Sequence, residues 1–265
     1  MNRPHAGHLL EPIRGARARS GGLLVGLDFD GTLAPIVAEP QAAAMSGGMR
    51  AALESLVQRS DTHVAFVSGR SLDDLAGRTA IDGAWYVGNH GFEIRGPGFE
   101  RVLPEAEAAR ETIAMIAGAL ERELGDVPGV IVEDKGLTLS VHYRQVEDTA
   151  AAARVRDAVV RTAAGLDHVR STHGKMVVEI RPDIDWDKGR AFAFLRETLA
   201  PRIGAVPALF IGDDVTDEDA FRTLSPGEWA IYVGELPDDR DTAATASLHG
   251  PDEVETFLRG LDEAR

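Results

Sequence analysis

The chain has 265 residues, of which 44% are hydrophobic, so it can form one large domain or two small ones with a substantial core. Its net charge of −15 argues against a nucleic-acid or anionic-membrane partner, because phosphates attract a basic surface. The absence of cysteine excludes disulfides, zinc–thiolate sites and thiol catalysis. We find no stretch with the character of a membrane span or a secretory signal, and therefore expect a cytoplasmic protein with a flexible tail over residues 1–22.

The first part of the chain alternates apolar strands with helices. The segment LLVGLDF, residues 23–29, is apolar almost throughout, which is typical of a buried strand in a parallel sheet. A helix is predicted from Ser46, and the next strands are HVAFVSG (63–69) and WYVGNHG (85–91). Between them, Ser71 and Asp74 have the spacing of a capping box, which predicts the start of a short helix. This order predicts an α/β fold with a parallel, Rossmann-like sheet that has helices on both faces.

The pattern changes over residues 105–181, which read as helix–strand–strand twice in succession. Turn residues at Lys135–Gly136 and Gly174–Lys175 predict an antiparallel hairpin in each half. We therefore expect an inserted α+β cap domain over 105–181. The core domain is then discontinuous and consists of residues 23–104 and 182–265.

After the insert the first pattern resumes. Asp187 is expected to cap a helix, and PALFIGDD (207–214) is a further apolar strand that ends in two acids. Thr216 and Asp219 have the spacing of a capping box, which predicts the start of the next helix. The strand WAIYVG and the helix PDEVETFLRGLDEA close the chain.

Three apolar strands end in acidic or small polar residues: Asp28–Asp30, Ser68–Gly69 and Asp213–Asp214. The carboxyl ends of parallel strands share one edge of a sheet, so these side chains converge there. Clustered carboxylates repel one another unless protons or a metal neutralise them. Because the motifs contain oxygen ligands only, they favour a hard cation, magnesium first.

Magnesium beside a carboxylate is typical of phosphoryl transfer. One aspartate can attack phosphorus, and Asp30, two residues after Asp28, can act as general acid and base. Lys188 lies at a predicted helix start and can screen the clustered charge. The hydroxyl and backbone N–H groups at Ser68–Gly69 can hold phosphoryl oxygens.

These segments resemble the four ordered motifs of the haloacid-dehalogenase superfamily: DFDGT at 28–32, SGR at 68–70, Lys188, and GDD at 212–214 with Asp217. The insert resembles that superfamily's C2-type cap. More narrowly, GNHGFEIR, VEDKGLTLSVHYR, GKMVVEIRP and WDKGRA are similar to segments of the trehalose-6-phosphate phosphatase family. This resemblance implies a magnesium-dependent phosphatase that hydrolyses trehalose 6-phosphate through an aspartyl-phosphate, the last step of trehalose biosynthesis.

The resemblance also implies roles for the core residues. Asp28 is the nucleophile and a magnesium ligand, and Asp30 is the general acid/base whose backbone carbonyl also binds the metal. Asp213 is the third protein ligand, and Asp214 acts directly or through water. Phosphoryl binding is assigned to Ser68 and Lys188.

The remaining assignments concern the substrate. Arg70 either contacts the substrate or forms an ion pair with an acid of the core. The sugar hydroxyls are expected to meet charged and polar side chains, which make strong hydrogen bonds. The residues expected to bind them are Asn89, His90, Glu133, Lys135, Arg144, Lys175 and Glu179.

Several alternatives stay open at this point. Asp28 to Gly31 alone could be a solvated turn, Lys188 a surface lysine, and the acids and lysines of the cap solvated hairpin charges. The substrate could be sucrose phosphate, mannosyl-3-phosphoglycerate or a monosaccharide phosphate. A mutase and a non-catalytic binding relative are the other rivals. A monomer is favoured, although the sequence does not determine the oligomeric state.

Overall fold

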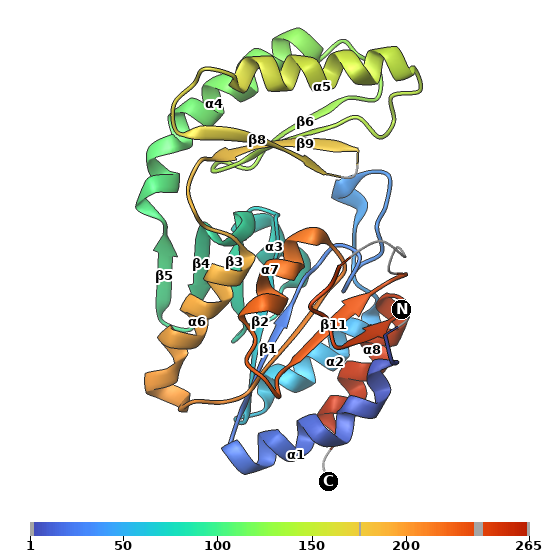
Figure 1. Cartoon of the computed structure of the whole chain (residues 1–265), viewed down its shortest axis with the longest axis vertical. Coiled ribbons are helices and arrows are strands. Elements are labelled where there is room, and N and C mark those ends of the chain that lie inside the picture. Colours follow the sequence, from blue (N-terminus) through green and yellow to red (C-terminus); the bar gives the residue numbers. More distant parts are fainter. Residues whose placement is uncertain (1–2, 175, 236–240, 264–265) are drawn as a thin grey trace. The chain divides into compact units, whose positions relative to one another are not determined.

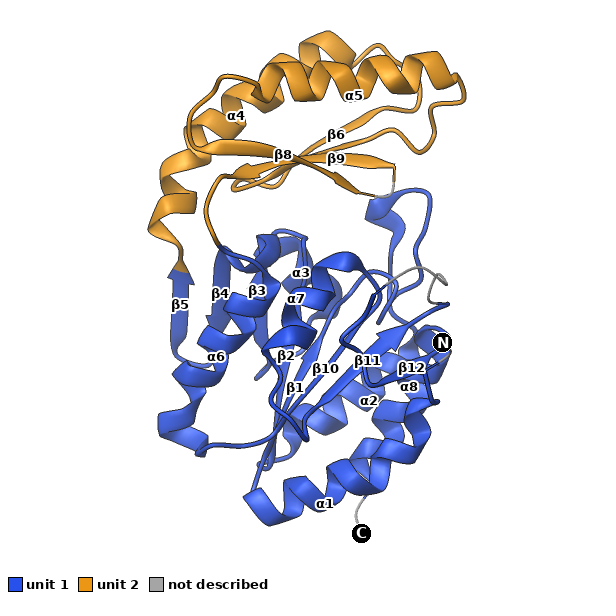
Figure 2. Cartoon of the chain, viewed as in Figure 1, with its two compact units in different colours: residues 1–101, 186–265 blue, residues 102–185 orange. Residues whose placement is uncertain are grey.

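The computed structural model describes residues 3–174, 176–235 and 241–263 (Figure 1). The chain divides into two compact units, one of residues 1–101 and 186–265 and the other of residues 102–185 (Figure 2). Over the described ranges, no helix combines the length and the hydrophobicity that a membrane crossing requires.

The first unit is built on an eight-stranded sheet in the order β12-β11-β10-β1-β2-β3-β4-β5. The pairs from β12 to β3 are parallel, and β4 then runs antiparallel to β3. The strands are β1 Leu23–Leu27, β2 Thr62–Val67, β3 Trp85–Gly88, β4 Glu93–Gly96, β5 Phe99–Val102, β10 Ala208–Gly212, β11 Trp229–Val233 and β12 Ala246–Leu248.

Helices cover both faces of this sheet, because successive strand residues point to opposite sides and both sides are apolar. In β1, Val25 and Leu27 join the core on one face, and Leu24 joins the core on the other. The first face carries α1 Leu10–Ser20, α2 Gly47–Gln58, α3 Leu72–Thr79 and α8 Pro251–Asp262, and the second carries α6 Lys188–Ile203 and α7 Val215–Thr223. Short 3₁₀ turns are η1 Ala6–Leu9, η2 Pro40–Ala42 and η3 Asn89–Gly91. The predicted α/β class with a parallel, Rossmann-like sheet is confirmed.

Three neighbouring strands bring the predicted motifs to one edge of the sheet. Leu27, at the end of β1, pairs in register with Phe66 of β2 and Ile211 of β10. Since all three strands run in the same direction, the residues that follow them lie together at their carboxyl ends. On the same side, α6 begins where the Asp187 carboxylate accepts a hydrogen bond from the Arg190 N–H at 2.8 Å, as predicted.

The start of α7 differs from the expectation. The predicted capping box of Thr216 and Asp219 is wrong, because the helix begins two residues earlier. Its N-cap is Asp214, and the reciprocal partner is Asp217. This places the carboxylate of Asp217 back over the end of β10 rather than out along the helix.

The second unit is a four-stranded antiparallel sheet, ordered β6-β7-β9-β8, with two helices. Its apolar residues, such as Val141 and Val178, pack against the helices on one face. A polar row of Glu133, Ser140 and Glu179 is aligned across the strands on the opposite face. The elements are α4 Pro104–Leu124, β6 Ile131–Asp134, β7 Leu139–His142, α5 Thr149–Ala163, β8 Val169–Gly174 and β9 Val177–Pro182.

The prediction of a flexible tail over residues 1–22 is wrong for the described part of that segment. Ile13 of α1 is fully buried in the core of the first unit. Arg17 is also buried, with its Nε 3.7 Å from an Asp61 oxygen, and it donates to the Thr62 hydroxyl at 3.4 Å. The segment looks polar in sequence because its arginines outnumber its buried apolar residues, and one of those arginines, Arg17, is itself buried, as long charged side chains can be.

We expect Ile13→Ala to lower the free energy of unfolding by about 2–5 kcal/mol, because it leaves a cavity where α1 meets the core. Ile36→Ala is a matched control, since the Ile36 side chain is 50% exposed, and should change stability by no more than about 0.5 kcal/mol. Urea denaturation followed by circular dichroism measures both. Equal midpoints for the two variants would show that α1 is not part of the folded core.

Candidate active site

Lys188 lies between two buried carboxylates at the carboxyl edge of the large sheet. Its Nζ donates to Asp28 Oδ1 at 2.7 Å and to Asp217 Oδ1 at 2.8 Å. Lys188 is 3% exposed, Asp28 4% and Asp217 0%, so the three charges are almost completely removed from water. A buried ammonium ion is stable only when it is paired, and here it has two partners that are far apart in the sequence.

Burial by itself shifts the pKa values of the two partners of this ion pair in opposite directions, because it disfavours the charged form of each. Burial raises the pKa of Asp28 well above its ordinary value, although Lys188 acts against that shift. Burial alone would lower the pKa of Lys188, but the charges of Asp217 and Asp28 outweigh it and raise that pKa. Lys188 is therefore a permanent cation whose charge favours the ionised form of Asp28, while the net shift of the Asp28 pKa remains upward.

Asp217 organises this end of the sheet, although the sequence placed it only in the fourth motif and indicated no role for it. Its Oδ2 accepts hydrogen bonds from the backbone N–H groups of Asp213 and Asp214, both at 3.0 Å, while its Oδ1 accepts from Lys188. A Cβ on Gly212 would lie only 2.3 Å from the Asp217 carboxyl carbon, so only glycine fits there. The spacing of Asp214 and Asp217, which is that of a capping box, was the signal that could have identified it.

Asp213 supplies the feature that points to a bound cation. Its Oδ1 is buried and has no hydrogen-bond partner in the described part of the chain. Oxygens of Asp28, Asp213 and Asp217 lie within 4.8 Å of one another. Burial and the neighbouring charges of Asp217 and Asp214 raise the pKa of Asp213 to about 7. Such a group of carboxylates is relieved either by a proton or by a divalent cation.

The residues present fit a hard divalent ion. Both oxygens of Asp217 already accept hydrogen bonds, so Asp28 and Asp213 are the carboxylates best placed to hold the ion. The chain approaches them closely at Gly31, which has φ +83°, and a Cβ there would lie 2.1 Å from Asp213 Oδ2. Asp214 is exposed at the start of α7, and its predicted metal role stays a prediction.

Arg70 forms the ion pair that was one of its two predicted roles. Its guanidinium donates two hydrogen bonds to the Asp30 carboxylate and one to Asp74, all at 2.7 Å. These carboxylates raise the pKa of Arg70 although its burial acts in the other direction. The pair orients Asp30, whose side chain is 40% exposed, at the rim of the cluster. A contact between Arg70 and substrate stays a prediction.

The other core residues predicted for the site lie close to the end of β2. The buried Ser68 hydroxyl accepts a hydrogen bond from the Arg70 N–H at 3.2 Å. Asn89 and His90 follow β3 with φ values of 47° and 57°, in the left-handed region. The His90 ring packs on Gly69, where a Cβ would lie 2.6 Å from His90 Cε1. Both η3 side chains are buried, so they form part of the wall of this edge.

The predicted sugar-binding residues of the second unit form pairs on the polar face of its sheet. Glu133 lies 2.9 Å from the His142 ring, and Glu179 accepts from Lys135 at 3.3 Å and from Ser140 at 3.0 Å. Arg144 is exposed in the turn after β7. Lys175 lies outside the described residues. The sugar-binding role of this set stays a prediction.

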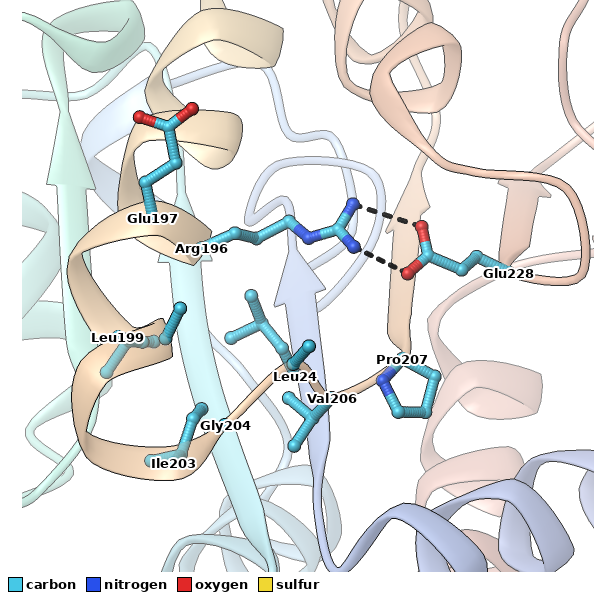
Figure 3. A pocket seen from close by; sticks show the side chains of 11 residues that line it. Leu24, Arg196, Glu197, Leu199, Ile203, Gly204, Val206, Pro207 and Glu228 are labelled. Atoms are coloured by element: carbon cyan, nitrogen blue, oxygen red, sulfur yellow. Dashed lines mark hydrogen bonds and ion pairs between the residues drawn. The ribbon is translucent and has the colours of Figure 1, made fainter.

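A pocket of about 370 Å³ lies at the opposite end of the strands (Figure 3). Leu24 at the start of β1 and Pro207 before β10 line it, together with the last turns of α6. Its charged pair, Arg196 and Glu228, is joined by hydrogen bonds of 2.6 and 3.0 Å. Because this pocket is at the amino ends of the strands and mostly apolar, it is not the site of the carboxylate chemistry.

Residues 26–251 match the model of the trehalose-phosphatase family. The chain belongs to this family. It is 42% identical over 239 residues to the trehalose-phosphate phosphatase of Mycobacterium marinum and 43% identical over 242 residues to that of Mycobacterium avium. Each match covers 88% of this chain but 60% of the relative, so the chain spans less than two thirds of their length.

Solved structures agree with the fold. A trehalose-6-phosphate phosphatase from Aspergillus fumigatus is 27% identical, with a TM-score of 0.62 over 98% of this chain and 99% of that one. The C-terminal domain of the Candida albicans enzyme has a TM-score of 0.77 at 23% identity, over 98% of both chains. A haloacid dehalogenase-like hydrolase from Bacteroides thetaiotaomicron shares the fold at a TM-score of 0.59 and 16% identity, over 90% of this chain and 99% of that one. The family implies a divalent metal, in agreement with the carboxylate cluster.

The cluster predicts a pH-dependent stability in the absence of metal. Because the folded-state pKa of Asp213 is about 7 and its ordinary value is 3.8, the folded chain holds an extra proton between those values. Its contribution to stability is therefore full below about pH 4 and is lost as the pH rises through about 7. Asp213→Asn should flatten this part of the profile, measured by melting in EDTA from pH 4 to 8. If the unchanged chain and the Asp213→Asn variant gave parallel profiles, the raised pKa of Asp213 would be contradicted.

Proposed function

We propose that this chain is a magnesium-dependent phosphatase that hydrolyses trehalose 6-phosphate to trehalose and phosphate. The observation that carries this proposal is the buried Asp28–Lys188–Asp217 arrangement beside Asp213, whose Oδ1 has no hydrogen-bond partner among the described residues. A carboxyl nucleophile, a fixed ammonium ion and an oxygen-only ligand set are the components that phosphoryl transfer requires. The names of the family's members support the choice of sugar phosphate.

The chemistry follows from the positions of the side chains. Asp28 attacks phosphorus through the carboxylate and forms an aspartyl-phosphate as the bond to the sugar oxygen breaks. To act as general acid, Asp30 has to carry a proton and leave its ion pair with Arg70; in that form it donates the proton to the departing oxygen, and as the carboxylate it then accepts one from the water that cleaves the aspartyl-phosphate. Lys188 neutralises charge beside Asp28 throughout. A magnesium ion held by Asp28 and Asp213 supplies further neutralisation of the phosphoryl oxygens.

We propose a separate binding role for residues of each unit. The Ser68 hydroxyl, directly after β2, holds phosphoryl oxygens. The polar sheet face of the second unit, with Glu133, Lys135 and Glu179, recognises the sugar hydroxyls. The metal role of Asp214, the cytoplasmic location and the monomeric state stay predictions.

The direct test is release of inorganic phosphate by the purified chain. We expect magnesium-dependent release from trehalose 6-phosphate that greatly exceeds release from sucrose 6-phosphate and glucose 6-phosphate. Asp28→Asn should reduce turnover by at least about a thousandfold while the protein stays folded, because the nucleophile is lost. Asp73→Asn is the matched control, since the Asp73 side chain is 91% exposed, and should keep normal turnover. A fully active Asp28→Asn protein would eliminate the proposed nucleophile.

Sugar recognition can be tested separately from phosphoryl transfer. Glu179→Ala should lower turnover of trehalose 6-phosphate by about tenfold or more, because a charged hydrogen-bond partner is lost. Turnover of p-nitrophenyl phosphate, which has no sugar, should change little. The exposed Glu147, changed to Ala, is the control from the same unit. Equal losses on both substrates would remove the sugar-reading role from Glu179.

A further inference from the structure

Two histidines and a glutamate that are distant in sequence meet on the surface of the first unit. His5 Nε2 lies 3.2 Å from Glu253 Oε2, and His249 Nδ1 lies 3.0 Å from both Glu253 oxygens. One ligand atom from each residue lies within 4.8 Å of the other two. The two rings are stacked, with centroids 6.2 Å apart. None of these residues belongs to the carboxylate cluster described above.

The backbone holds these three side chains in place. His5 pairs with Ser247 in an isolated β-bridge, and the Ser247 N–H donates to the Pro4 carbonyl at 3.0 Å. His249 follows β12 directly, and its backbone N–H donates to Glu253 Oε2 at 2.8 Å. Glu253 is in the first turn of α8, which packs into the core of the unit. The N-terminal segment is thereby fixed beside α8 (Figure 1).

The spacing of the ligand atoms suits a four-coordinate transition metal. Ligands at about 2.0–2.2 Å from zinc lie roughly 3.3–3.6 Å apart in a tetrahedron. The two contacts with Glu253, at 3.2 and 3.0 Å, are slightly shorter, and the ligand atoms of the two histidines lie within 4.8 Å of each other. Two imidazoles with one carboxylate prefer zinc, nickel or copper, whereas the oxygen-only active site prefers magnesium. The side chains of His5 and His249 are 54% and 74% exposed, so an ion can enter and water can complete its coordination.

We propose that His5, His249 and Glu253 form a surface site for a divalent transition metal, zinc being the type ion, that ties the N-terminal segment to α8. The inference is independent of the proposed phosphatase activity.

The His5 ring sets which ions can compete for the site. The Gly7 N–H donates to His5 Nδ1 at 3.1 Å, so the proton of the neutral ring is on Nε2, facing Glu253. A metal ion that binds Nε2 requires the proton of the neutral ring to move to Nδ1. Nδ1 then no longer accepts the hydrogen bond from the Gly7 N–H. Ions with a strong preference for imidazole can do this, whereas magnesium and calcium, which prefer oxygen, cannot.

The test is zinc binding by isothermal titration calorimetry on the whole chain, in excess magnesium so that the carboxylate cluster is occupied. We expect one zinc ion per chain and an increase in melting temperature on zinc addition. His249→Ala and His5→Ala should each weaken zinc binding by at least about tenfold and abolish the thermal shift. Melting of both variants in EDTA establishes that they are folded.

Two controls make the outcome decisive. His173→Ala removes an exposed histidine of the second unit and should bind zinc as the unchanged chain does. Asp213→Asn alters the active site and should also leave this zinc binding intact. The proposal is overturned if the unchanged chain binds no zinc in excess magnesium, if the His5 and His249 variants bind it normally, or if Asp213→Asn is the change that removes it.

Discussion

The arrangement of side chains at the carboxyl edge of the large sheet depends on one buried ammonium ion. Lys188 is the cation that neutralises Asp28 and Asp217, two carboxylates that are almost completely removed from water. Burying one such carboxylate without a partner costs several kcal/mol, and breaking a buried pair costs about as much. Because Lys188 is the first residue of α6, the position of that helix determines whether the acidic ends of β1 and β10 can lie next to each other.

The pairing explains why a large segment can be inserted in the chain without disturbing the site. Residues 102–185 form a compact unit of their own, and α6 begins shortly afterwards with Asp187 as its cap. The core requires only that α6 starts at the correct edge of the sheet. Close backbone approach completes the geometry, as at Gly189, where a Cβ would lie 2.2 Å from the Asp219 carbonyl oxygen of α7. The roles proposed for the two units, sugar recognition and phosphoryl transfer, are accordingly assigned to separate parts of the sequence.

Much of the fold could be predicted because its signals are local. Apolar strands that are followed directly by Asp28 and Asp213, together with the helices between the strands, indicate a parallel sheet and a shared edge. The position of α1 could not be predicted in the same way, because the single fully buried apolar side chain of that helix, Ile13, gives almost no periodic signal. Short edge strands such as β12 have too few residues for a pattern.

The site was predictable in its residue types and less so in its pairings. The lysine and the strand-end aspartates followed from the motifs, but Asp217 resembled an ordinary helix N-terminal acid, whose charge the helix dipole favours. Its second function, as a partner of Lys188, depends on a contact between residues 29 positions apart that sequence spacing does not reveal. Similarly, only the folded chain distinguishes the ion pair of Arg70 with Asp30 from a contact with substrate.

The central claim is that the carboxylates gathered around Lys188 are completed by one divalent cation. Crystals grown with manganese, which replaces magnesium and scatters anomalously, test it most directly. The account predicts one strong anomalous peak at this edge of the sheet, at bonding distance from oxygens of both Asp28 and Asp213, with the Lys188 pairs intact. A map without a peak there, or with Asp28 and Asp213 turned away from each other, would contradict it.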